Sequence, residues 1–242
     1  MNVLDDGYMH STDTKTTNYS VVVPTLWRYP FFVDFLKDLV RFPMVDDIVV
    51  INNNMAATPV DDIFQHAKIR MIAQGENIGV NPAWNLGVQI SRNNKVCIVN
   101  DDVIFDLKMF YHVDTVLSPA SGVVGICPGV ADFGQPPVVS GAIKILPWAG
   151  QHTYGFGCLM FVHRAWWIDI PAGLRIYYGD NWIFDTCLAR GRTNYIITDA
   201  LFHTPYATST KELPNINGIH AVEQPIYNQA MLEFRAKQTP TS

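Results

Sequence analysis

The residues with the clearest capacity for chemistry are Asn100, Asp101 and Asp102, which follow directly on the apolar run 95–99. Such a β-branched run predicts a buried strand, so the two carboxylates stand at the tip of that strand. Adjacent carboxylates at such a place repel each other and lose hydration unless a positive charge compensates them. A divalent cation with oxygen ligands, completed by phosphate oxygens, would compensate them. The alternative is a solvated turn in which Asp102 or Asp106 caps the next segment.

Composition limits the classes of protein that fit. The chain has 242 residues, of which 48% are hydrophobic and 16% charged, as expected for one α/β domain or two small ones. The net charge of −5 argues against broad electrostatic binding to nucleic acid, which fits only as a locally held substrate. Arg190 and Arg192, on either side of Gly191, fit a solvated helix end better than a nucleic-acid patch.

The cysteines and the hydropathy pattern bear on location. Cys97, Cys127, Cys158 and Cys187 have neither zinc-ligand spacing nor the density of a disulfide framework, so we expect reduced thiols and a cytoplasmic protein. Residues 1–18 are polar and lack the apolar region of a signal peptide. No apolar run has the length of a transmembrane helix, so we expect no integral membrane association. The sequence leaves the oligomeric state open.

Strand-like and helix-like segments alternate through the first half of the chain. Strands are predicted at 20–23, 47–51, 69–73 and 95–99, and helices at 29–42, at 60–66 and after Val80, where Asn81 is the expected cap. This alternation predicts a mostly parallel sheet flanked by helices. Ligands of such sheets bind beyond the carboxyl ends of the strands. Polar residues are therefore expected to converge there, namely Thr25, Asn52, Asn53, Asn77 and the segment 100–102.

The second half has a different character. Residues 127–157 are rich in Gly and Pro, which favours hairpins and long loops over helices. Strands are predicted at 138–146, 156–162 and 193–198, the first of them in an antiparallel ribbon. Helices are predicted from Asp180 to Gly191 and over 222–235.

In this order the segments resemble the GT-A glycosyltransferases, most closely the family-2-like group that uses nucleotide-diphosphate sugars. The resemblance is carried by residues 21–25, 47–53, 76–79 with 83–87, 100–102, 157–164, 178–182 and His203. It implies a single α/β domain of the GT-A (Rossmann-like) fold, a mostly parallel sheet flanked by helices with a smaller antiparallel acceptor-side ribbon. That domain would span 19–235, with a nucleotide-sugar half at 19–126 and an acceptor half at 127–235, between a flexible segment (1–18) and a tail (236–242).

The resemblance also implies a metal site for Mn²⁺ or Mg²⁺. Asp102 matches the last position of the family's Asp-x-Asp motif and would be a direct ligand, with His203 as a second. Asn100 stands at the first position, so the ribose contact there would be an amide, while Asp101 would bind ribose or shape the metal shell. A lone histidine after a strand is otherwise a packed or solvent-facing residue. The other candidate histidines are His152, His163 and His220.

Asp180 stands where the family has its acidic catalytic base, in a segment that reads Gly-Asp-Asn-Trp instead of the commoner Glu-Asp pair. It would deprotonate an acceptor hydroxyl from a pocket supplied by Tyr177, Tyr178 and Trp182. Direct displacement with such a base inverts the anomeric configuration, so the resemblance implies an inverting enzyme. The alternative is that Asp180 is only the N-cap of a helix.

The remaining candidates are binding residues. Those for the nucleotide sugar are Pro24, Thr25, Arg28, Asn52, Asn53, Asn77, Asn85, Asn100 and Asp101, although any of the asparagines could simply be a turn residue. Those for the acceptor are Trp148, Tyr154 and Trp182. Trp166 and Trp167 fit core packing better than sugar stacking.

The sequence thus predicts a hexosyl- or pentosyltransferase with a nucleotide-diphosphate sugar, such as a UDP-sugar, as donor. The acceptor would be a saccharide or another hydroxyl compound, including a hydroxylated DNA base turned out of the stack. A catalytically silent nucleotide-sugar or carbohydrate-binding module on the same fold is the rival, which the retention of Asp101, Asp102 and Asp180 disfavours. A nucleotidyltransferase or a dinucleotide-binding oxidoreductase would need a glycine-rich loop after the first strand, and residues 24–28 do not form one.

Overall fold

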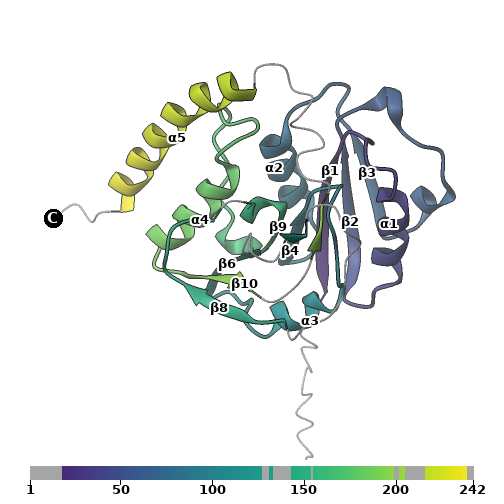
Figure 1. Cartoon of the computed structure of the whole chain (residues 1–242), viewed down its shortest axis with the longest axis horizontal. Helices are drawn as coiled ribbons and strands as arrows, with labels where there is room; N and C mark the ends of the chain where they lie inside the picture. The colour runs from purple at the N-terminus through teal and green to yellow at the C-terminus, as the bar shows by residue number, and fades with distance from the viewer. Residues whose placement is uncertain are drawn as a thin grey trace, which may run out of the picture.

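The computed structural model describes residues 18–126, 131–132, 143–153, 155–198, 202–204 and 216–238 (Figure 1). The strands in these ranges are β1 (Tyr19–Thr25), β2 (Val45–Asn52), β3 (Ile69–Ala73), β4 (Lys95–Val99), β5 (Ile104–Phe105), β6 (Ser121–Ile126), β7 (Ala131–Asp132), β8 (Ile145–Trp148), β9 (Leu159–His163), β10 (Thr193–Ile197) and β11 (Phe202–His203). The α-helices are α1 (Phe32–Arg41), α2 (Val80–Ile90), α3 (Met109–Asp114), α4 (Gly179–Ala189) and α5 (Ile216–Gln238).

The main sheet has eight strands in the order β3-β2-β1-β4-β9-β6-β10-β8. Strands β3, β2, β1 and β4 run parallel to one another, as do β6 and β10. Strand β9 runs antiparallel between β4 and β6, and β8 runs antiparallel to β10 at the edge. The predicted α/β fold is confirmed, because parallel strands with helical crossovers dominate and the antiparallel strands lie in the second half of the chain.

Alternation along β1 explains how the sheet is covered on both faces. Val21 and Val23 belong to one buried cluster with α1 and α3, whereas Val22 belongs to another with α2, α4 and α5. Figure 1 shows α1 and α2 on opposite sides of β1, β2 and β3. A strand that is buried on both faces is mostly apolar at successive positions, which is why residues 21–23, 48–51 and 96–99 read as continuous apolar runs.

A second, three-stranded sheet, β5-β11-β7, places β11 beside β5. His203 is paired with Ile104, two residues after Asp102. The backbone at His203, the predicted metal ligand, therefore runs beside the strand that follows the segment 100–102. Its side chain is outside what the structure describes.

Several elements differ from the prediction at their ends. Gly79 (φ 92°), not Asn81, precedes α2, and a Cβ at Gly79 would lie 2.6 Å from the Arg175 carbonyl oxygen. Asn81 is instead buried inside α2, where its Nδ2 donates to the Tyr177 carbonyl at 2.8 Å. The predicted helix at 60–66 is a 3₁₀ turn, η2 (Asp62–Gln65), and the predicted strand 156–162 begins as another, η4 (Phe156–Cys158).

The C-terminal helix is longer than predicted. It runs over Ile216–Gln238 with Pro225 inside it, so residues 236–238 are helical rather than part of a tail.

Of the predicted strand 138–146, positions 138–142 lie outside the described residues. Cys97, Cys158 and Cys187 are free thiols, whereas Cys127 is outside the described part. No helix within the described ranges is both long and apolar enough to cross a membrane.

Candidate active site

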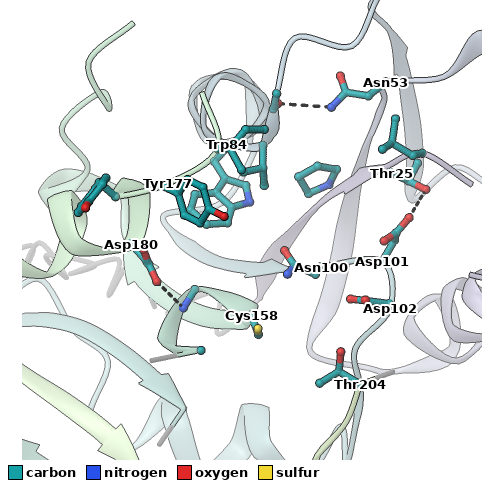
Figure 2. A pocket seen from close by; sticks show the side chains of 18 of the residues that line it. Thr25, Asn53, Trp84, Asn100, Asp101, Asp102, Cys158, Tyr177, Asp180 and Thr204 are labelled. Carbon is teal, nitrogen blue, oxygen red and sulfur yellow. Dashed lines mark hydrogen bonds between the residues drawn. The ribbon is translucent and has the colours of Figure 1, made fainter. Parts of the chain in front are cut away.

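A pocket of about 450 Å³ lies beyond the carboxyl ends of β1, β2 and β4 (Figure 2). The strand ends contribute Pro24, Thr25, Leu26, Asn53, Asn100, Asp101 and Asp102. The start of α2 and the segment before it contribute Asn77, Gly79, Val80 and Trp84. The second half of the chain contributes Thr204, which lies on the side of Asp102 (Figure 2), and the residues of the opposite wall, namely His152, Gly155, Gly157, Cys158, Ile176, Tyr177, Tyr178, Asp180, Asn181 and His220. The predicted convergence of strand ends is therefore found at this pocket.

Asp101 and Asp102 stand on one side of the pocket. Thr25 Oγ1 donates to Asp101 Oδ2 at 2.6 Å, and Asp102 is buried, with 8% of its surface exposed. Burial raises the pKa of Asp101 to about 6, and the neighbouring Asp102 adds to the rise while the Thr25 hydrogen bond opposes it. Asp101 therefore holds a proton at mildly acidic pH more readily than an isolated aspartate.

Asp180 faces them across the pocket, from the first turn of α4 (Figure 2). Its Oδ2 accepts the backbone N–H of Gly157 at 3.1 Å and lies 3.0 Å from His152 Nε2, and its Oδ1 accepts the N–H of Asn181 at 3.0 Å. Burial alone would raise the pKa of Asp180, but the hydrogen bond and charge of His152, with the two backbone donors, hold it below its usual range. Asp180 is thus kept as a carboxylate.

The interpretation of Asp180 as an N-cap is wrong. The cap position of α4 is Tyr178, which adopts a left-handed conformation (φ 61°), and Asp180 lies two residues further along. Glycine at 157 makes this placement of Asp180 feasible, because a Cβ there would lie 2.8 Å from Asp180 Oδ2. The carboxylate is held by Gly157 and His152, both distant in sequence, as well as by the N–H of Asn181 in the first turn of its own helix.

Besides His152 Nε2, which approaches Asp180 Oδ2 at 3.0 Å without hydrogen-bond geometry, two buried polar atoms of the pocket have no hydrogen-bond partner among the described residues: Asn53 Oδ1 and Trp84 Nε1. Asn53 uses its Nδ2 to donate to the Gly79 carbonyl at 3.4 Å, and Trp84 is 4% exposed. Leaving such a group unsatisfied costs about 1–3 kcal/mol. Both therefore mark places where a ligand would form hydrogen bonds. The sequence indicated Trp84 only as part of the segment 83–87, because an aromatic residue at helical spacing carries no further signal.

Helix α5 also contributes to the pocket, which the sequence did not predict. The Tyr178 hydroxyl lies 2.8 Å from His220 Nε2, and Tyr178 stacks on Tyr227 with ring centroids 5.1 Å apart. The buried carboxylate of Glu223 accepts the backbone N–H groups of residues 175–177, at 2.9 Å for Arg175 and 2.7 Å for Tyr177. Helix α5 thus holds the aromatic wall that precedes α4.

Three predicted donor-side residues do not line the pocket. Asn52 is 2% exposed, and its Oδ1 accepts from Trp27 Nε1 at 2.9 Å and from the Asn54 N–H at 2.8 Å, so it shapes the turn after β2. Asn85 is paired with both backbone groups of Ile170. Arg28 is exposed and is not among the lining residues. Asn52 and Asn85 thus form hydrogen bonds with groups that do not line the pocket, and the donor-binding roles of the three residues stay predictions.

The acceptor-binding role of Trp148 and Trp182 also stays a prediction. Trp182 is 5% exposed and donates to the Ile168 carbonyl at 3.1 Å, while Trp148 donates to the Gln151 carbonyl at 2.9 Å, and neither lines the pocket. Trp166 lies between the guanidinium groups of Arg190 and Arg192, 4.5 and 3.9 Å from its ring centroid, which gives both arginines a packing role. Tyr154 is outside the described residues.

The described residues hold no group of three or more His, Cys, Asp or Glu side chains able to bind a metal. His163 packs away from the pocket, where its Nδ1 accepts the N–H of Ala165. Asp101, Asp102, Asn100 and Thr204 instead offer oxygen atoms alone on one side of the pocket. Such a donor set fits a hard divalent cation whose shell is completed by ligand phosphates.

Residues 20–133 match the family model described as glycosyl transferase family 2. The resemblance to this family is confirmed. The matched segment runs from the first strand to just beyond the end of β6, and so contains the strand ends that carry Asp101 and Asp102. No curated protein matches the chain.

Solved structures of S. aureus TarS have a similar fold. TarS 1–349 in complex with UDP-GlcNAc has a TM-score of 0.59 at 13% identity, covering 91% of this chain and 71% of that one. TarS 1–349 has a TM-score of 0.53 at 17% identity (77% and 60% covered), and TarS has 0.54 at 16% (77% and 36%). The chain thus spans 60% of the first of the solved TarS chains and about a third of the last. At these identities the likeness establishes the GT-A fold.

Proposed function

We propose that the protein is an inverting, divalent-cation-dependent glycosyltransferase that moves a sugar from a nucleotide-diphosphate sugar to an acceptor hydroxyl. One observation carries the proposal. A single pocket holds a carboxylate pair at the end of β4 and, across from it, the ionised carboxylate of Asp180 (Figure 2). Glycosyl transfer needs stabilisation of the leaving group and a base for the acceptor, and the two carboxylate sites would supply them separately.

The donor is proposed to bind over the ends of β1 and β2. Pro24, Thr25 and Asn77 line this side, and the unpaired Asn53 Oδ1 and Trp84 Nε1 offer one acceptor and one donor of hydrogen bonds. A nucleotide presents complementary groups on its base, ribose and phosphates. UDP-GlcNAc in the complex of the structurally similar TarS supports a UDP-sugar as the donor class.

A divalent cation is proposed because of the charge of the pocket. Its described lining includes Asp101, Asp102 and Asp180 but no Lys or Arg, so a diphosphate would meet like charge. Asp102 and Asp101 would hold Mn²⁺ or Mg²⁺ through their oxygens. When bound, such an ion supplies Lewis-acid stabilisation of the leaving diphosphate, an effect of several kcal/mol. The raised pKa of Asp101 means that protons compete with the cation at acidic pH.

Asp180 is proposed as the base. Its Oδ2 already accepts from Gly157 and faces His152, whereas its Oδ1 accepts one backbone N–H and keeps a lone pair. The acceptor hydroxyl would give its proton to Asp180 while its oxygen bonds to the anomeric carbon. The bond from that carbon to the phosphate oxygen breaks on the opposite side, so the anomeric configuration inverts.

The test is a panel of nucleotide sugars, UDP-GlcNAc among them, incubated with Mn²⁺ and scored by hydrolysis and by thermal stabilisation. A true donor at a hundredfold excess over its dissociation constant should stabilise the fold by about 2.7 kcal/mol. Stabilisation without hydrolysis, unchanged in Asp180→Asn, would favour the silent binding module. Failure of every nucleotide sugar to bind would contradict the proposed function itself.

A further inference from the structure

His152 belongs to none of the motifs that carry the family resemblance, yet it contacts the proposed base. It lies between β8 and η4, and its Nε2 is 3.0 Å from Asp180 Oδ2. Its side chain is 12% exposed and packs against Phe156 and Phe184, with ring centroids 5.2 and 5.6 Å away. Both His152 and Asp180 line the pocket. The histidine therefore packs against two aromatic rings and has one nitrogen within 3.0 Å of the carboxylate.

The surroundings of Asp180 single out His152. The N–H groups of Gly157 and Asn181 are backbone donors, which the fold supplies whatever the side chains are. The other titratable groups close enough to sense Asp180 are Cys158, whose pKa is raised to about 12 by burial, and Tyr227, whose pKa is also raised. Both stay neutral near pH 7. Among the described groups around this carboxylate, His152 is thus the side chain whose hydrogen bond and charge can tune it.

The geometry also shows which oxygen remains for chemistry. Oδ2 is engaged by Gly157 and His152, and Oδ1 receives only the N–H of Asn181. A carboxylate oxygen has two lone-pair sites, so Oδ1 keeps one. A donor on Oδ2 fixes the rotation of the carboxylate about its Cβ–Cγ bond and directs that free site of Oδ1. An unrestrained carboxylate would have to be ordered at the moment of reaction.

We propose that His152 is a positioning residue for the base. Its Nε2–H, 3.0 Å from Oδ2 of Asp180, would donate to that oxygen during the reaction and leave a lone pair of Oδ1 to take the acceptor's proton. The inference rests on the proposed function. In the transfer step the hydroxyl proton moves to Oδ1, the acceptor oxygen bonds to the anomeric carbon, and the electron pair of the broken C–O bond leaves with the diphosphate. His152 keeps its own proton throughout, so it orients the carboxylate without itself acting as the base.

Three variants separate positioning from packing. His152→Phe keeps a ring between Phe156 and Phe184 but has no donor. His152→Gln keeps an N–H at about the reach of Nε2, and His152→Asn keeps an amide too short to reach Oδ2. His112→Gln, at an exposed position of α3, is the matched control. If His152 only fills space, His152→Phe should be the variant closest to the wild type. If His152 positions Asp180, His152→Gln should be the closest.

The first measurement is the titration of the Asp180 carboxyl carbon by NMR in the ligand-free protein, assigned with Asp180→Asn. In His152→Phe and His152→Asn the pKa of Asp180 should rise, because fewer donors then oppose the effect of burial. In His152→Gln the pKa of Asp180 should rise less, and in His112→Gln it should equal that of the wild type. Because no nucleotide sugar is involved, this measurement does not depend on the proposed function.

The second measurement is Mn²⁺-dependent hydrolysis of UDP-GlcNAc between pH 5 and 9. The rate should fall roughly 100-fold in His152→Phe, the loss typical of a misplacement of about 1 Å, and its acidic limb should move to higher pH. His152→Gln should recover most of the rate. An unchanged Asp180 titration in both His152→Phe and His152→Asn, or a loss in His152→Gln as large as in His152→Phe, would overturn the positioning role. A wild type that titrates as expected but hydrolyses no nucleotide sugar would contradict the proposed function while leaving the contact established.

Discussion

The two halves of the molecule build the pocket in different ways. In the first half, the lining side chains follow consecutive parallel strands, β1, β2 and β4, and they meet because such strands end at one edge of the sheet. In the second half they come from a loop, a 3₁₀ turn and the starts of α4 and α5. The family match ends at residue 133, close to this division. The donor side thus follows from a general topology, whereas the opposite wall depends on contacts particular to this chain.

The same comparison holds for the carboxylates. Asp101 in the first half and Asp180 in the second are the same residue type in one pocket, yet burial raises the pKa of Asp101 to about 6, while His152 and two backbone donors lower that of Asp180. Asp101 lies beside a second carboxylate, Asp102, whereas Asp180 lies beside His152 and two backbone N–H donors. This difference fits the proposed roles, in which Asp101 and Asp102 would bind a cation and Asp180 would accept a proton.

The largest expected effect is on the donor side. Asp102→Ala should abolish transfer and Mn²⁺-dependent binding of the nucleotide sugar, because the proposed cation loses its direct ligand. The melting temperature of the ligand-free protein should change little or rise, because a buried carboxylate beside Asp101 is removed. Isothermal titration with and without Mn²⁺ measures the binding. Transfer that survives both this substitution and chelation would end the metal-dependent mechanism.

On the opposite wall, Asp180→Asn should lower turnover by roughly two to four orders of magnitude, the usual contribution of a general base. Donor affinity should persist, since the proposed cation site is across the pocket. The amide can still accept the Gly157 N–H, so the fold should remain. Turnover, donor affinity and melting temperature are measured on one preparation. Parallel loss of all three would make Asp180 structural and remove the distinction between the two sides.

The two carboxylates should also have opposite effects on stability. Because burial raises the pKa of Asp101 to about 6 in the folded protein, well above that of an exposed aspartate, its contribution to stability is full below about pH 4 and is lost as pH rises through 6. The pKa difference between the folded and unfolded states is about 2, and each pKa unit corresponds to about 1.36 kcal/mol, so the loss of stability is roughly 3 kcal/mol. Urea unfolding from pH 4 to 7.5 should therefore show Asp101→Asn gaining stability over the wild type as pH rises. Folding lowers the pKa of Asp180, so its ionised form stabilises the protein at pH values above the pKa that it has in the unfolded chain, and this stability is lost on acidification. Relative to the wild type, Asp180→Asn should therefore become less stable as pH rises.

The smallest effect concerns the unpaired donor of Trp84. Trp84→Phe should raise the KM for the nucleotide sugar up to about tenfold with kcat nearly unchanged, because one hydrogen bond contributes about 0.5–1.5 kcal/mol and acts in ground and transition states alike. Trp182→Phe is the matched control. Its Nε1–H is already paired with the Ile168 carbonyl, so stability should fall while KM stays constant. An equal KM change in both variants would show that Trp84 acts through packing.

Much of the fold was predictable because it depends on local periodicity. The helix predicted at 29–42 forms as α1, which buries Phe32, Phe35, Leu36 and Leu39, and β3 has the predicted bounds 69–73. The errors lie at element ends. Asn81 and Asp180 both have the residue type of a cap, but their side chains find partners in Tyr177 and Gly157, far along the chain. Capping propensity is a weak local preference that such long-range contacts override.

The sequence by itself determined the order of strands and therefore which residues reach the pocket edge, because apolar runs and their polar ends are local in the chain. It identified Thr25, Asn53, Asn100, Asp101 and Asp102 at the pocket for that reason, whereas Asp180 was implied by the family resemblance. Only the tertiary structure decided which way each side chain turns. Asn52 faces Trp27 whereas Asn53 lines the pocket, and Asp180 meets His152 from a segment 28 residues away. Such pairings arise when distant segments pack together and buried polar groups must find partners, and no periodicity in the sequence records them.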